Sequence, residues 1–177
     1  MRWLVDGYNV IRRAPELKSR EQESLEAGRQ ALCALLVQVA RASADTFTVV
    51  FDGAQAGGRA GGGSGVSVIF SSARESADSV LAGMAREGGA VVSNDRDVRR
   101  AAERAGATVV TTDQFLARLD QAHRRPPEAS AELMDDDREE EPSRGPRKGN
   151  PRRLSKKNRA AQRALGRLRP GRHPHAQ

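Results

Sequence analysis

The chain has 177 residues and a formal net charge of +7, a length that suits one domain with an additional segment. Its hydrophobic fraction of 37% is below the roughly 45–50% of globular chains, so part of it is expected to contribute nothing to a core. No apolar run approaches the about 18 residues of a membrane-spanning helix or resembles a signal peptide, and the single cysteine excludes a disulfide scaffold or a multi-cysteine zinc site. We therefore expect a soluble cytoplasmic protein with no membrane partner.

Short apolar runs closed by small or polar residues alternate with helical patterns along the first part of the chain. The runs predict buried parallel strands over 2–5, 46–51, 66–70, 90–92 and 107–110. Apolar spacing and N-cap residues predict helices over 21–42, 76–86, 95–105 and 113–123, the last three capped by Ser76, Asp95 and Asp113. This order predicts an α/β fold, a three-layer α/β/α sandwich with a mostly parallel central sheet.

The glycine-rich segment 53–65 interrupts this alternation, because no crossover helix is apparent in it. We interpret it as a mobile surface loop. The alternative is a flexible flap over a bound ligand, with Arg59 contacting phosphate.

Charge divides the chain into three parts. Residues 128–141 carry eight acidic side chains and one arginine, whereas residues 143–177 carry twelve Lys and Arg and no acid. We therefore predict a folded domain over 1–125, an acidic linker over 126–142 and a basic tail over 143–177 that is disordered or partly helical. Basic segments bind phosphate backbones, and a solubilising tail is the alternative. The predicted RNA-binding residues are Arg152, Arg153, Lys156, Lys157, Arg159 and Arg163.

Aspartates follow several of the predicted strands. Parallel strands bring their carboxyl ends to one edge of a sheet, where ligands bind. Clustered carboxylates repel one another, and a hard cation such as Mg²⁺ or Mn²⁺ removes that cost. Helix capping by Asp95 and Asp113, a turn at Asp52-Gly53 and an exposed helical position for Asp78 are the structural alternatives. The acids concerned are Asp6, Asp52, Asp95 and Asp113, together with Asp78 at the start of a helix.

Five segments in order resemble the NYN domain, and in particular its bacterial YacP-like branch. They are LVDGYNVI, VVFDG, ESADSVL, VVSNDRDVRRAAERAGATVV and TTDQFL, and the resemblance covers about residues 2–120. It implies a fold similar to PIN nucleases and a metal-dependent endoribonuclease. It also implies catalytic roles for Asp6, Asn9, Asp78 and Asp95, while Asp52 matches a further family position and Asp97 is an additional acid.

These residues lead to a hypothesis for the chemistry. Asp6, Asp78 and Asp95, with Asp52 beside them, would hold Mg²⁺ or Mn²⁺, which activates water and neutralises charge at phosphorus. Asn9 would orient a water or a carboxylate by hydrogen bonds. The expected partner is RNA, free or on the ribosome, and no small-molecule cofactor is expected. The alternative is a non-catalytic RNA- or ribosome-binding module with the same fold.

Overall fold

The computed structural model describes residues 1–53, 56–124 and 155–168. In these ranges a six-stranded sheet has the order β3-β4-β2-β1-β5-β6. All neighbouring strands pair in parallel except β3 and β4, which are antiparallel. The strands are β1 (Arg2–Asp6), β2 (Thr46–Phe51), β3 (Ala56–Gly63), β4 (Val66–Ser72), β5 (Ala90–Val92) and β6 (Thr108–Val110).

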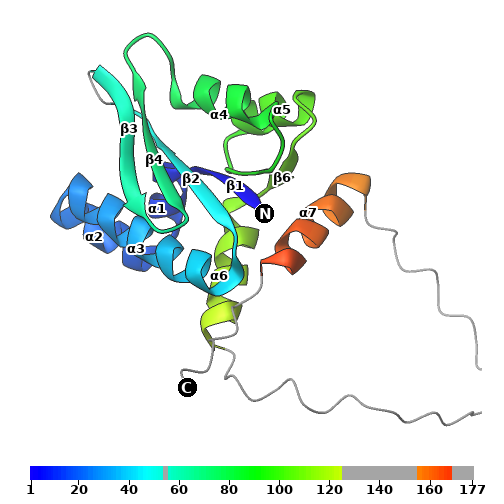
Figure 1. The fold of residues 1–177 in the computed structure, drawn as a ribbon, viewed down its shortest axis with the longest axis horizontal. Coiled ribbons are helices and arrows are strands. Elements are labelled where there is room, and N and C mark those ends of the chain that lie inside the picture. Colours follow the sequence, from blue (N-terminus) through cyan, green and yellow to red (C-terminus); the bar gives the residue numbers. More distant parts are fainter. Residues whose placement is uncertain (54–55, 125–154, 169–177) are drawn as a thin grey trace, which may run out of the picture.

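Helices cover both faces of the sheet (Figure 1). The helices α1, α2, α3 and α6 lie on one face and α4 and α5 on the other, so the predicted three-layer α/β arrangement is confirmed. None of the helices in the described ranges is long and apolar enough to cross a membrane. Their bounds are α1 (Gly7–Arg13), α2 (Pro15–Glu23), α3 (Leu25–Ser43), α4 (Ala77–Ala85), α5 (Arg96–Arg104), α6 (Thr112–Arg124) and α7 (Lys156–Arg167).

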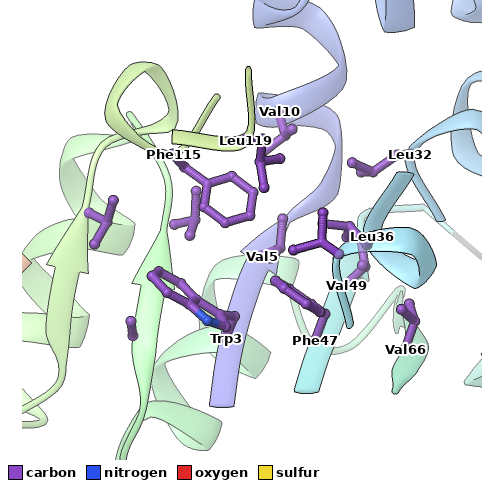
Figure 2. Close-up of a cluster of buried hydrophobic side chains, with 14 of the residues drawn as sticks. Trp3, Val5, Val10, Leu32, Leu36, Phe47, Val49, Val66, Phe115 and Leu119 are labelled. Carbon is purple, nitrogen blue, oxygen red and sulfur yellow. The ribbon is translucent and has the colours of Figure 1, made fainter. Parts of the chain in front are cut away.

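The core on the α3 and α6 face is built around three aromatic rings (Figure 2). The Trp3 ring lies 5.5 Å from the Phe115 ring and 6.5 Å from the Phe47 ring, measured between centroids. Leu4, between two residues that point to this core, packs instead into the cluster under α4 and α5. This alternation along β1 shows that both faces of the sheet are buried, as expected for parallel strands between helical layers.

Two predicted elements differ from the structure. The expected loop 53–65 contains strand β3, which runs antiparallel along β4 at the edge of the sheet. The sequence did not predict this strand, because the segment is rich in glycine and glycine has low strand propensity. The Arg59 side chain lies outside the described residues, so its proposed contact with phosphate remains a prediction.

The predicted helix 21–42 is also wrong at its start. Ser24 accepts a hydrogen bond from the Ala27 amide at 3.0 Å and caps α3, while α2 ends at Glu23. A β-carbon at Gly28 would lie 3.0 Å from the Glu21 Cα atom, so the glycine allows the two helices to approach closely.

The basic C-terminal segment contains the helix α7. Its buried face consists of Ala161 and Ala164, and the following Leu168 is 1% exposed within the same cluster as Trp3. The Arg118 side chain of α6 donates to the Leu165 carbonyl oxygen at 3.0 Å. The expectation of a partly helical tail therefore holds for these residues, and they also complete the core beside β6. The predicted division at residues 125, 126–142 and 143 stays a prediction, and the linker lies outside the described residues.

Candidate active site

The acids that follow β1, β2 and β5 share one edge of the sheet, because β1 pairs in parallel with both β2 and β5. Asp6 ends the central strand of the three, Asp52 follows β2, and Asp95 follows β5 by three residues. Asp78 lies in the first turn of α4, whose N-terminus faces the same edge. The fold thus brings four of the predicted site residues together although they are up to 89 positions apart in the sequence.

Asp6 is held in one orientation by hydrogen bonds to both carboxylate oxygens. Its Oδ1 atom accepts from the Asn9 amide at 3.2 Å and so caps α1. Its Oδ2 atom accepts from the Ser93 hydroxyl at 2.9 Å. Burial raises the pKa of the Asp6 carboxyl, and the nearby Asp95 charge adds to the rise, while the two hydrogen bonds oppose it.

Ser93 connects Asp6 to the loop that carries Asp95. The fully buried Ser93 hydroxyl also accepts a hydrogen bond from the Asp95 amide at 3.0 Å. Asp95 in turn caps α5, accepting from the amides of Asp97 and Val98 at 2.7 and 3.2 Å. The predicted capping role of Asp95 is confirmed. The same side chain also lies close enough to Asp6 to affect its pKa.

Asn9 joins three loops at this edge. Its Oδ1 atom accepts from the Asn94 amide at 3.1 Å and from the Thr112 hydroxyl at 2.8 Å. The Asn94 side chain then accepts from the Thr112 amide at 3.0 Å. Asn9 therefore fixes the loops after β5 and β6 relative to β1, and this is the contact that orients the Asp95 loop.

Gly7, between Asp6 and Tyr8, allows α1 to begin directly at the sheet edge. A β-carbon at this position would lie 2.3 Å from the Phe51 Cε1 atom. The ring cannot retreat easily, because it stacks on Phe70 at 5.8 Å and meets the Tyr8 ring edge-on at 5.1 Å. Close packing against Phe51 thus explains the glycine in the motif Asp6-Gly7-Tyr8-Asn9 (DGYN).

Asp52 and Asp78 complete the acidic edge from the β2 side. The buried Ser71 hydroxyl donates to Asp52 Oδ1 at 2.6 Å. The pKa of the exposed Asp78 carboxyl is raised by partial burial first and then by the charges of Asp95, Asp6, Asp52 and Asp97, in that order. Four other carboxylates are therefore close enough to raise the pKa of Asp78, so negative charge is concentrated at this edge.

The residues fit a hydrated divalent cation and do not form a closed metal cage. Within the described ranges, no three His, Cys, Asp or Glu side chains lie close enough to hold one ion together. Mg²⁺ usually takes one or two carboxylates directly and completes its shell with waters and phosphate oxygens. The available donors are all oxygens, and the mutual repulsion of the acids is a cost that such a cation relieves.

Asp113 belongs to a different set of contacts. The predicted N-cap role of Asp113 is wrong, since Thr111 and Gln114 form a reciprocal pair at the start of α6, with distances of 3.2 Å in both directions. Asp113 instead accepts from Arg13 at 2.6 Å and from the Asn94 side chain at 2.9 Å. These hydrogen bonds, the one from Arg13 first, lower the pKa of the Asp113 carboxyl.

The predicted RNA-binding residues fall partly on α7. Lys156, Arg159 and Arg163 are exposed and follow one another at helical spacing on a face other than the buried one. Lys157 is also exposed and pairs with Glu103 at 2.6 Å, in the last turn of α5. Because α5 begins at the acidic edge, this contact anchors α7 toward the other end of the sheet. Arg152 and Arg153 lie outside the described residues.

Sequence reasoning missed the hydroxyl and amide groups that orient the acids. Ser93, Ser71 and Thr112 are each 1% exposed or less, and each lies at the end of a strand or within two residues of it. The signal was present, since hydroxyl residues close the strands at 71, 93 and 111–112. Nothing in the sequence indicated that Ser93 would contact Asp6, Ser71 Asp52, and Thr112 the Asn9 amide oxygen.

Comparison with known proteins identifies the family of this fold and site. The family model described as the YacP-like NYN domain matches residues 3–162. The chain belongs to the YacP-like NYN domain family. This family is of nuclease type and is related to PIN domains, as the sequence resemblance predicted.

Solved structures of the NYN relative Rae1 (YacP) from Bacillus subtilis are similar to this chain. One has 26% identity and a TM-score of 0.60, and the match covers 70% of this chain and 77% of that chain. That structure is a single-substitution mutant, and the crystal structure of Rae1 without that substitution has 25% identity and a TM-score of 0.60, with 70% and 76% covered. Among curated proteins no match was found.

Proposed function

We propose that this YacP-like NYN protein is a metal-dependent endoribonuclease that cleaves RNA phosphodiester bonds with Mg²⁺ or Mn²⁺. One observation carries the proposal: Asp6, Asp52 and Asp95 end or follow three neighbouring parallel strands, and Asp78 lies at the same edge of the sheet, where their charges raise its pKa. A protein that only binds RNA gains nothing from an acidic cluster, because it repels phosphate. With a divalent cation the same cluster becomes a site for phosphodiester chemistry.

Asp6, Asp52, Asp78 and Asp95 would hold a hydrated cation, one or two of them directly and the others through its waters, with different degrees of preorganisation. Asp6 is fixed by Ser93 and the Asn9 amide, and Asp52 is fixed by Ser71. Asp78 is exposed and has no hydrogen bond of its own among the described residues, so its carboxylate is free to turn toward an ion or a water. When bound, the cation supplies an activated water and neutralises charge at the scissile phosphate.

Asp95 and Asn9 contribute through the loop after β5. Asp95 uses Oδ1 to cap α5, which leaves its Oδ2 atom available for the site. Asn9 holds this loop through the Asn94 amide at 3.1 Å. We assign Asn9 a positioning role, in which it keeps the Asp95 carboxylate at a fixed distance from Asp6.

The exposed basic face of α7, formed by Lys156, Arg159 and Arg163, would bind RNA or a ribosomal RNA surface outside the cleavage site. Its charges lie on a helix packed into the core beside β6, so they are presented on a fixed surface. Phosphate contacts of this kind add affinity without reading sequence. The family relationship supports RNA as the partner.

The test is cleavage of a mixed RNA pool with Mg²⁺, with Mn²⁺ and with a chelator. Asp78→Asn should abolish cleavage and keep the fold, whereas Glu87→Gln is a matched control, because Glu87 lies beyond the far end of α4 and pairs with Arg2 at 2.8 Å. Full activity in chelator would contradict metal dependence. RNA binding without cleavage under every metal condition would favour the alternative, a non-catalytic RNA- or ribosome-binding module.

A further inference from the structure

An arginine held by aromatic rings lies beside the acidic edge. The Arg29 guanidinium carbon lies 5.1 Å from the Phe70 ring centroid, 5.5 Å from that of Tyr8 and 5.6 Å from that of Phe51. Only 21% of the Arg29 side chain is exposed. Three rings therefore hold the guanidinium in one place, each by a cation–π contact.

The Arg29 side chain donates two hydrogen bonds to the Tyr8 hydroxyl oxygen. Both its Nε atom, at 3.0 Å, and one terminal nitrogen donate to the Tyr8 oxygen. Among the described residues, this hydroxyl accepts two hydrogen bonds and donates none. Its own hydrogen is thus available for an outside acceptor, and the adjacent positive charge makes it a stronger donor.

Arg12 adds a second positive charge to the same ring. It follows Tyr8 by one turn of α1, its guanidinium carbon lies 5.3 Å from the ring centroid, and 66% of its side chain is exposed. Tyr8 follows Asp6 by two residues, and its ring meets at 5.1 Å that of Phe51, the residue before Asp52. The cluster and the candidate active site are therefore neighbours.

Neighbouring acids do not neutralise these two arginines fully. Arg12 and Glu21 are 3.5 Å apart, and Arg29 and Glu26 are 3.6 Å apart, with Glu26 64% exposed. Neither pair forms a hydrogen bond among the described residues, and the buried Glu21 Oε1 atom has no hydrogen-bond partner, so Arg12 keeps its donors for another acceptor. Two guanidinium groups that approach one ring repel each other, and an anion bound between them relieves that repulsion.

We propose that Tyr8, Arg12 and Arg29 form a phosphate-binding site for the RNA strand beside the bond that is cut. The Tyr8 hydroxyl donates to a non-bridging phosphate oxygen, Arg12 supplies the accessible charge, and Arg29 is a positioning residue that holds Tyr8. The acidic edge repels the phosphates on either side of the scissile one, so the strand needs a cationic contact next to it. This inference rests on the proposed endoribonuclease function and assigns how that site holds its substrate.

The experiment separates affinity from chemistry with variants of the full chain. Binding and single-turnover cleavage of one single-stranded oligoribonucleotide are measured across a salt series for Tyr8→Phe, Arg12→Gln and Arg12→Lys. The phenylalanine keeps the ring contacts and removes only the hydroxyl. Arg41→Gln is the control, because Arg41 is an exposed arginine in the last turn of α3, at the end of the sheet opposite the acids.

Tyr8→Phe should weaken RNA binding about 10-fold or more, as expected for a lost hydrogen bond to a charged group, with little change in the cleavage rate at saturating RNA. Arg12→Gln should lower the slope of log affinity against log salt by about 0.7, and Arg12→Lys should restore it. Tyr8→Phe should leave that slope unchanged, since it removes no charge. Arg41→Gln should match the wild type in both measurements.

The outcomes distinguish the two proposals. Wild-type binding by Tyr8→Phe and Arg12→Gln, in an enzyme that Asp78→Asn inactivates, would overturn the phosphate site and leave the endoribonuclease standing. Weakened binding by both variants in a protein that cleaves with no metal would support the phosphate site and overturn the metal-dependent endoribonuclease. A loss of saturated cleavage equal to the loss of affinity would overturn the assignment of Tyr8 to substrate binding.

Discussion

Leu168 tests whether the basic C-terminal segment is part of the folded domain. Its side chain is 1% exposed and lies in the cluster that contains Trp3 and Phe115. Replacing it by alanine removes three carbon atoms from a closed environment. At about 0.8 kcal/mol per buried methylene, the transfer cost is about 2.4 kcal/mol, and the cavity brings the expected loss to about 3–4 kcal/mol. For a domain of this size that corresponds to a fall in Tm of roughly 6–16 °C.

The assay is urea and thermal unfolding followed by tryptophan fluorescence. The chain has one tryptophan, Trp3, which is fully buried in the same cluster, so its emission reports on the core that Leu168 completes. Leu25→Ala is the matched control, because Leu25 is 52% exposed. We expect this control to change the free energy of unfolding by less than about 1 kcal/mol.

Equal stabilities of Leu168→Ala and Leu25→Ala would refute the reasoning, since they would mean that α7 is not docked in solution. The structure also changes the meaning of a tail deletion. A truncation before residue 155 removes Ala161, Ala164 and Leu168 from the core together with the basic side chains. Substituting Arg159 and Arg163 in place removes charge alone, and this is the appropriate test of RNA binding by α7.

Three further predictions concern the acidic edge. The pKa of Asp78 is raised in the folded state, so ionisation of this carboxyl lowers the stability of the fold at neutral pH. Asp78→Asn should therefore raise Tm at pH 7. In thermal scans this gain should disappear as the pH falls below the ordinary carboxyl pKa of 3.8. Ser93→Ala removes a hydrogen bond that lowers the Asp6 pKa, so it should move the acidic limb of the cleavage pH profile to higher pH. An unmoved limb would mean that the rate is not controlled by ionisation of Asp6. Mg²⁺ at about ten times its dissociation constant should stabilise the wild type by about 1.4 kcal/mol, and a similar gain in Asp6→Asn by calorimetry would place the ion elsewhere.

Local chemistry determines most of this fold. Short runs such as Thr46–Phe51 are apolar and β-branched, and they can be stable only when buried between helical layers. Five of the six strands and the three-layer arrangement therefore followed from the sequence. The caps at Ser76 and Asp95 were visible for the same reason, since a short polar side chain beside a helix start satisfies free amides.

Sequence patterns failed where a segment owes its conformation to its neighbours. Strand β3 is rich in glycine and forms because β4 offers an edge for pairing. The residues of α7 were predicted as a disordered or partly helical basic tail, and nothing in their pattern indicated the surface beside β6 against which Ala161 and Ala164 pack. In both cases the partner surface is distant in the sequence or lies on another element, and intrinsic propensity carries no information about it.

The sequence by itself placed Asp6, Asp52, Asp78 and Asp95 at positions that a parallel sheet brings to one edge, and the DGYN motif pointed to the family. Only the tertiary structure decided which groups hold them. Hydrogen bonds act over about 3 Å, so the contact of Ser93 with Asp6, the bridge from Asn9 to Thr112 and the ring of Tyr8 under two arginines exist only once β1, β5 and α3 are packed together.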